Sequence, residues 1–242
     1  MTHYDEQRRF FEHLSRRYDS RFLRSRWPRN QLLKAGVISD VLGSAIETGP
    51  VAEVGCGTGQ IAEFLLDANP RLEYVGLDLS ESMLAIARQR LARFGDRVEL
   101  KLVEGPLGLP RGRYAGVFGV DVLHHVDEPV LVLGEIRDGL RPGGPIVFLE
   151  PNPRFPITTV LGIFEKEERN VLKIGFRNLR HWFEEAKLEN VHVSYGALYT
   201  PPGPPALVPA FDRVDSALAK IPILRAMTIF FTARGRAPAL ND

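Results

Sequence analysis

The sequence predicts an α/β fold in which helices cover both faces of a mostly parallel sheet. From Val51 onward, short apolar runs typical of strands alternate with amphipathic patterns typical of helices, and this alternation is the mark of parallel β/α units. A glycine-rich loop directly follows the first run, at the sheet edge where α/β proteins bind ligands. With 242 residues, 44% of them hydrophobic, the chain can bury such a core within a single domain, residues 1–242.

Composition excludes several other classes of protein. One cysteine can form neither an intrachain disulfide nor a metal cluster held by several thiolates. The balance of 31 basic and 30 acidic residues, a net charge of +1, argues against a dedicated nucleic-acid binder. The N-terminal segment is polar, and no stretch reaches the ~18 apolar residues of a spanning helix. We therefore expect a cytoplasmic protein without a metal site and without a nucleic-acid partner.

The central part of the chain contains five strand-and-helix steps. The expected strands are Val51–Val54, Leu72–Leu77, Val98–Val103, Val117–Val122 and Ile146–Leu149. Ser80 is suited to cap the helix after the second strand, and Gly95 ends that helix. The helix before the fifth strand ends at the Pro142-Gly143-Gly144 turn.

The two flanks of this central part differ from it in character. Residues 5–46 have the pattern of two amphipathic helices, with arginines concentrated between Arg16 and Arg29. These arginines are either a solvated helix face or a basic surface for an anionic substrate group or an acidic membrane. After Glu150 we expect a loop-rich segment, a helix at Leu179–Ala186 and a strand at Val191–Leu198. A proline-rich segment, a short helix near Ile221 and a last strand at Met227–Ala233 complete the expected elements.

The glycine loop, Glu53 to Gly59, indicates which cofactors fit. A dinucleotide-binding loop needs its third glycine three positions after the second, and here that position holds Gln60. The loop also lacks the lysine that binds triphosphates. Asp78, at the end of the second expected strand, is placed to accept hydrogen bonds from two ribose hydroxyls. These features favour a nucleoside cofactor without phosphates.

Four motifs in this order resemble the class I S-adenosylmethionine-dependent methyltransferases of the type 11 small-molecule group. They are the glycine loop from Glu53, the segment Asp78 to Ala87, Leu123-His124-His125, and Leu140 to Gly144. The resemblance implies a Rossmann-like sheet of seven strands in the order 3-2-1-4-5-7-6, with the last strand antiparallel. It also implies S-adenosyl-L-methionine as the cofactor and a small molecule as the methyl acceptor.

The resemblance assigns most of the cofactor-binding candidates. The loop glycines would lie under the methionine part, Asp78 would bind the ribose, Met83 would contact the adenine, and Tyr18 in an N-terminal lid would cover the cofactor. A Gly-Asp pair usual in the family is Gly105-Pro106 here, so adenine recognition falls to backbone groups near Glu104 to Leu107. The full set of cofactor-binding candidates is Glu53, Gly55, Cys56, Gly57, Gly59, Asp78, Leu79, Met83, Glu104, Gly105, Pro106, Val120 and Tyr18.

Charge supports this cofactor independently of the resemblance. Its sulfonium and ammonium groups suit acids near the loop, such as Glu53 and Asp121, whereas phosphates would need basic residues. Cys56 is interpreted as a small packing residue of the loop rather than a reactive thiol.

Three residues are candidate general bases for the transfer: His124, His125 and Asp121, which follow the fourth expected strand. The sequence does not single out one of them, nor an oxygen, carbon or nitrogen acceptor. Aromatic residues in the flanking segments favour a hydrophobic or aromatic acceptor, and a lipid-linked acceptor would bring peripheral contact with a membrane.

The predicted organisation is an N-terminal helical lid (1–48), a cofactor-binding core (51–150) and substrate-side elements (151–235), in a monomer or homodimer. Two alternatives stay open. One is an idle S-adenosylmethionine-binding sensor or partner subunit, because fold and cofactor site do not establish turnover. The other is a nicotinamide-dependent oxidoreductase, which the position of the third glycine disfavours.

Overall fold

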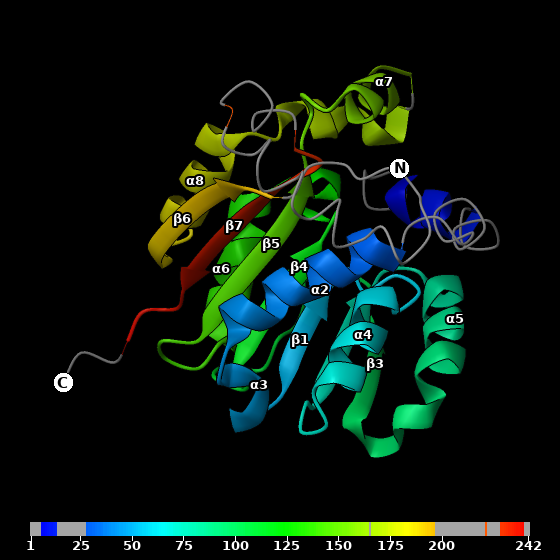
Figure 1. Ribbon diagram of the computed structural model, residues 1–242, viewed down its shortest axis with the longest axis vertical. Coiled ribbons are helices and arrows are strands. Elements are labelled where there is room, and N and C mark those ends of the chain that lie inside the picture. The colour runs from blue at the N-terminus through cyan, green and yellow to red at the C-terminus, as the bar shows by residue number, and fades with distance from the viewer. Residues whose placement is uncertain (1–5, 14–27, 165, 197–220, 222–227, 240–242) are drawn as a thin grey trace.

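The computed structural model describes residues 6–13, 28–164, 166–196, 221 and 228–239, and it contains a seven-stranded sheet (Figure 1). The strand order is β3-β2-β1-β4-β5-β7-β6, and β7 is antiparallel to both β5 and β6. The strands are β1 (Val51–Val54), β2 (Tyr74–Asp78), β3 (Val98–Leu102), β4 (Gly116–Val120), β5 (Pro145–Pro151), β6 (Glu189–Tyr195) and β7 (Phe230–Arg236). This confirms the predicted fold class, strand order and antiparallel last strand.

Helices cover both faces of the sheet (Figure 1). One face carries α2 (Pro28–Leu42), α3 (Ala45–Thr48), α4 (Gln60–Ala68) and α5 (Glu81–Leu91), and the other carries α6 (Pro129–Gly139) and α8 (Phe176–Glu185). Every residue of β1 and β2 is buried, as expected for parallel strands covered on both sides. The edge strand β3 is only partly buried and carries the charged residues Glu99 and Lys101.

Local capping follows the sequence closely at α5. Ser80 Oγ accepts a hydrogen bond from the Met83 backbone N–H at 3.2 Å, which satisfies one of the free donors of the first turn. After α5 a 3₁₀ segment, η1 (Ala92–Arg97), contains Gly95 with φ +56°, a left-handed conformation that suits glycine. The chain then enters β3.

One expectation was wrong: the segment after Glu150 is not loop-rich. It forms α7 (Pro156–Phe164) and a 3₁₀ segment, η3 (Lys166–Lys173). Pro156 occupies the first helical position, where its fixed φ and missing N–H favour a helix start rather than a loop. No helix in the described part of the chain is long and apolar enough to cross a membrane.

Several expectations fall outside the described residues. They are Tyr18, most of the arginine-rich stretch, the proline-rich segment and the body of the short helix before Ile221. Of the first amphipathic helix, the structure describes residues 6–13, called here the N-terminal helix. The last strand begins at Phe230, three residues later than expected, and continues to Arg236.

The contact between α8 and β5 gives a test of the core. Phe183 is fully buried and meets Phe148 edge-on, with ring centroids 6.3 Å apart. Replacing Phe183 with Ala leaves a cavity and should lower the free energy of unfolding by about 3–5 kcal/mol in urea denaturation. Leu131→Ala on α6 is the control, because Leu131 is 61% exposed and its loss should change stability by no more than about 0.5 kcal/mol. Equal effects of the two substitutions would contradict this packing.

Candidate functional site

A pocket opens at the carboxyl ends of β1 and β4, between which the direction of the strand order reverses. Open α/β sheets bind ligands at this point. The pocket is lined by Gln31, Glu53, Gly55, Cys56, Gly57, Thr58, Gln60, Ile61, Val120 and Asp121. Six of the predicted site residues meet here, and the two charged residues of the lining, Glu53 and Asp121, are both acids.

Two glycines of the loop have distinct geometric roles. Gly55, with φ +71°, has no room for a side chain, because a Cβ would lie 2.7 Å from Val122 Cγ2. Gly57, with φ +52°, faces open space, so a ligand can approach its backbone directly. A cofactor can therefore contact the uncharged backbone of the loop at Gly57 without meeting a side chain.

Asp78 holds this loop from the end of β2. Its Oδ2 accepts a hydrogen bond from the Gly57 N–H at 2.7 Å, and its Oδ1 accepts one from the Ser80 N–H at 2.9 Å. Burial raises the pKa of Asp78 to about 6, against the opposing effect of these backbone donors. Each carboxylate oxygen retains a lone pair, so the predicted ribose contact is compatible with the loop contact and stays a prediction.

Glu53 is the most deeply buried acid of the pocket, at 2% exposure. Tyr74 Oη donates a hydrogen bond to its Oε2 at 2.5 Å. Burial raises the pKa of Glu53 to about 8, more than the tyrosine hydrogen bond lowers it. Burial also raises the pKa of the neighbouring Cys56 thiol well above its usual range, which fits a packing role and not a reactive thiolate.

The other cofactor candidates that the structure describes are not among the residues that line the pocket. Met83 is 1% exposed, and Gly59 packs against α5, with its Cβ position 3.0 Å from Leu91 Cδ1. Residues 104–106, Glu104, Gly105 and Pro106, form an exposed bend. The Leu107 N–H, one of the expected adenine-binding groups, donates to Glu135 Oε2 at 2.7 Å. The adenine contacts, with those of Leu79, therefore stay predictions.

Glu150, near the end of β5, is a site residue that the sequence motifs did not indicate. Its side chain is fully buried and accepts hydrogen bonds from the N–H groups of Val122 at 3.0 Å and Leu123 at 2.8 Å. Its Oε2 also lies 2.8 Å from His124 Nδ1. An acid at the carboxyl end of a buried strand was the available signal, since Asp78 occupies the same edge of the sheet.

Glu150 thereby positions the two predicted histidines on a 3₁₀ turn, η2 (Leu123–His125). The rings of His124 and His125 lie 3.9 Å apart between centroids, and Phe11 of the N-terminal helix packs edge-on to His125 at 5.0 Å. His124 is 3% exposed, whereas His125 is half-buried. A hydrogen bond with Ser82 lowers the pKa of Glu12, so the N-terminal helix reaches from η2 to the start of α5. This position agrees with a lid, which stays a prediction.

Asp121, the third candidate base, is joined to Lys34 of α2. The Lys34 ammonium lies 2.5 Å from Asp121 Oδ2. Asp121 has φ +54°, a conformation that non-glycine residues adopt rarely and that clusters at functional sites. The structure therefore brings all three catalytic candidates to the end of β4 but gives each a different partner.

Comparison with known proteins agrees with this geometry. Residues 52–146 match the family model described as a methyltransferase domain. Over these residues the chain is similar to methyltransferase domains. A ubiquinone biosynthesis O-methyltransferase of Nitrosomonas europaea is 29% identical over 134 residues, 54% of this chain and 56% of that protein.

Two solved structures share the fold of this chain. A methyltransferase of Thermotoga maritima superimposes with a TM-score of 0.65 and 21% identity, over 95% of this chain and 99% of that one. A phosphoethanolamine N-methyltransferase of Haemonchus contortus, in complex with S-adenosylhomocysteine, gives a TM-score of 0.67 and 14% identity, over 99% of this chain and 60% of that one. The matched regions span 23% to 61% of four curated relatives, which is less than two thirds of their length.

Glu53 makes the stability of the protein depend on pH. Its pKa of about 8 in the folded chain exceeds the ordinary value of 4.5, so the folded state binds more protons than the unfolded state between these values. Stability is then greatest at low pH in this window and falls as pH rises towards 8, by up to about 1.4 kcal/mol per pH unit. Glu53→Gln should flatten this slope in chemical denaturation of the cofactor-free protein between pH 5.5 and 7.5.

The exposed Glu73 offers a matched control. Glu73→Gln should keep the slope of the wild-type protein. A Glu53→Gln slope as steep as that of the wild type would show that the Glu53 carboxyl is ionised throughout the range.

Proposed function

We propose that the chain transfers a methyl group from S-adenosyl-L-methionine to a small hydrophobic or aromatic acceptor. The observation that carries this proposal is the acid-lined pocket beside an open glycine loop at the switch point of the sheet. A sulfonium or ammonium beside Glu53 favours the ionised form of this carboxyl, whose pKa burial raises to about 8, whereas the lining of the pocket offers a phosphate no basic residue. Gln60, in the position of the third dinucleotide glycine, supports the same choice.

Bound S-adenosylmethionine supplies a methyl group that is already activated by the positive sulfur. The residues of the chain then have to exclude water and hold the acceptor in line with that methyl, at about 3–3.5 Å from it. The N-terminal helix, with Phe11 over His125, and the end of β4 enclose the side from which an acceptor would enter. Positioning is therefore the main contribution of the protein.

For an acceptor that must lose a proton, we assign the role of general base to His124. Glu150 Oε2 lies 2.8 Å from His124 Nδ1, which favours the tautomer with the proton on Nδ1 and makes Nε2 the basic nitrogen of the ring. Asp121 is less suited, because taking up a proton would disrupt its ion pair with Lys34. His125 then has a packing role, with its ring between those of His124 and Phe11.

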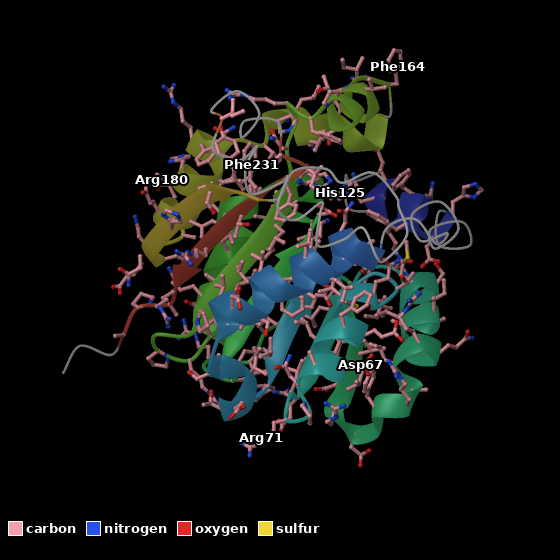
Figure 2. All side chains as sticks on the ribbon, viewed as in Figure 1. Asp67, Arg71, His125, Phe164, Arg180 and Phe231 are labelled. Carbon is pink, nitrogen blue, oxygen red and sulfur yellow. The ribbon has the colours of Figure 1, made fainter. Side chains whose placement is uncertain are left out.

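The hydrophobic nature of the acceptor is supported by two further observations. Relatives are named ubiquinone biosynthesis O-methyltransferases, and α7 exposes Val160, Ile163 and Phe164, the last to 81% (Figure 2). An apolar helix end of this kind suits a lipid-linked acceptor held near a membrane surface. A cytoplasmic location and a monomer or homodimer complete the proposal.

Extracts treated with radiolabelled S-adenosylmethionine test this function directly. Label in a lipid-phase product supports the hydrophobic acceptor, and label only in the polar pool would overturn that part of the proposal. Binding of the cofactor without transfer to any extract would favour a sensor or partner subunit. A thermal shift with NAD and none with S-adenosylmethionine would reject the cofactor itself.

Replacement of His124 and of Glu150 separates the base from the residue that positions it. His124→Gln should lower kcat by about 10²-fold or more with an oxygen acceptor. Glu150→Gln should lower kcat less and shift the pH profile of kcat, because the amide no longer favours the imidazolium form of His124. His125→Gln should leave that pH profile in place.

Folding of these variants is checked by thermal melting, and their cofactor sites by S-adenosylhomocysteine binding. Unchanged kcat in a folded His124→Gln protein would remove His124 from the mechanism.

A further inference from the structure

The helix α7 and the 3₁₀ segment η3 pack against each other beyond the end of β5 (Figure 1). A Cβ at Gly162 of α7 would lie 2.7 Å from Val171 Cγ1 and 2.9 Å from Leu172 Cδ2, so the two segments are in close contact. Val171 is buried in this contact. η3 also packs against η2, the turn that carries the two histidines. The pair of segments is therefore joined directly to the candidate active site.

The outer side of this pair exposes four large apolar side chains. Val160, Ile163 and Phe164 occupy positions i, i+3 and i+4 of α7 and so share one face of the helix. They are 53%, 53% and 81% exposed, and Leu172 of η3 is 41% exposed. These four are among only seven large hydrophobic residues that are exposed in the described part of the chain. A cluster of this kind, called here the α7–η3 patch, indicates an interaction surface.

Basic residues flank the α7–η3 patch. The exposed ones within residues 154–177 are Arg154, Arg169, Lys173 and Arg177. None of the four forms an ion pair with another residue that the structure describes. In the sequence, residues 154–177 hold five basic and three acidic residues, a net charge of +2, whereas the whole chain has a net charge of +1. The patch thus combines an apolar centre with positive surroundings.

Charge decides between a second copy of the chain and a lipid bilayer as the occupant of this surface. In a two-fold dimer formed through the patch, the basic residues of both copies would be brought together and would repel each other. A bilayer that contains anionic lipids offers acyl chains to the apolar side chains and phosphates to the basic ones. Lysine and arginine can also extend their charged ends to the headgroups while their stems stay in apolar surroundings. The α7–η3 patch is therefore complementary to an anionic membrane surface.

We propose that the α7–η3 patch docks the protein on the surface of an anionic lipid bilayer. Ile163 and Phe164 enter the boundary between headgroups and acyl chains, and Lys173 contacts lipid phosphates. This inference goes beyond the proposed function, because docking requires neither the cofactor nor methyl transfer. Since η3 packs against η2, docking holds the candidate active site close to the bilayer. A lipid-linked acceptor then reaches it without leaving the membrane.

Co-sedimentation with vesicles, in the absence of cofactor and acceptor, tests this docking. One set of vesicles contains phosphatidylcholine and phosphatidylglycerol, and the other contains phosphatidylcholine alone. The wild-type protein should bind the anionic vesicles more tightly. Phe164→Ser should weaken binding to them by about 10-fold or more, because an apolar ring no longer leaves water. Lys173→Glu should weaken it by about 5- to 30-fold, and should change binding to phosphatidylcholine alone by less than about 3-fold.

Two matched variants serve as controls. Leu131→Ser removes an exposed apolar side chain from α6, and Arg71→Glu reverses an exposed charge at the opposite end of the molecule from Phe164 (Figure 2). Both should bind vesicles as the wild-type protein does. Thermal melting checks that all four variants are folded, which their exposed positions favour.

Two results would overturn the docking proposal. One is a wild-type protein that binds neither set of vesicles, and the other is equal binding by the wild-type, Phe164→Ser and Lys173→Glu proteins. A dimer in sedimentation velocity that Phe164→Ser abolishes, without vesicle binding, would assign the patch to a second copy of the chain instead. None of these results bears on methyl transfer itself, which the labelled extracts test separately.

Discussion

The burial of acidic groups at one edge of the sheet is the constraint on which the site depends. Glu53, Asp78 and Glu150 lie at or next to the carboxyl ends of β1, β2 and β5 and are almost fully buried. A buried carboxylate is tolerated only when donors surround it. Here the donors are the Tyr74 hydroxyl for Glu53, the loop amides for Asp78, and the amides of η2 for Glu150. Each acid therefore organises the segment that follows a strand.

The three buried acids differ in how well they are hydrogen-bonded and in what they do. Glu150 accepts hydrogen bonds from several N–H groups and fixes the turn that carries the histidines. This structural contact determines where the histidine candidates for the general base lie. Glu53 has one hydroxyl donor, and burial raises its pKa to about 8. A cation placed beside Glu53 would favour the ionised form and offset this burial. The most poorly satisfied acid thus lies where a cationic cofactor would stabilise it most.

The sheet was predictable because strand alternation and loop glycines are local signals. Val51–Val54 was predicted to the residue, and Ser80 as the cap of α5 follows from its position before an amphipathic run. The seven-strand order came from the resemblance of four motifs, since strands β6 and β7 pair across a long insertion. The helix α7 was missed because three prolines near Glu150 indicate a loop, although Pro156 is the first residue of a helix.

The parts of the site that escaped prediction depend on contacts between distant segments. Lys34 lies between apolar residues of an amphipathic pattern, and only the crossing of α2 over the sheet brings it to Asp121, 87 positions later. Glu150 likewise acts 26 positions from His124. A count of charges in the sequence does not reveal such residues, because the 31 basic and 30 acidic residues nearly cancel. Their pairing across the fold forms a site in which α2 supplies the positive charge and the strand ends supply the negative charges. The polarity of the pocket therefore depends on how α2 packs against the sheet.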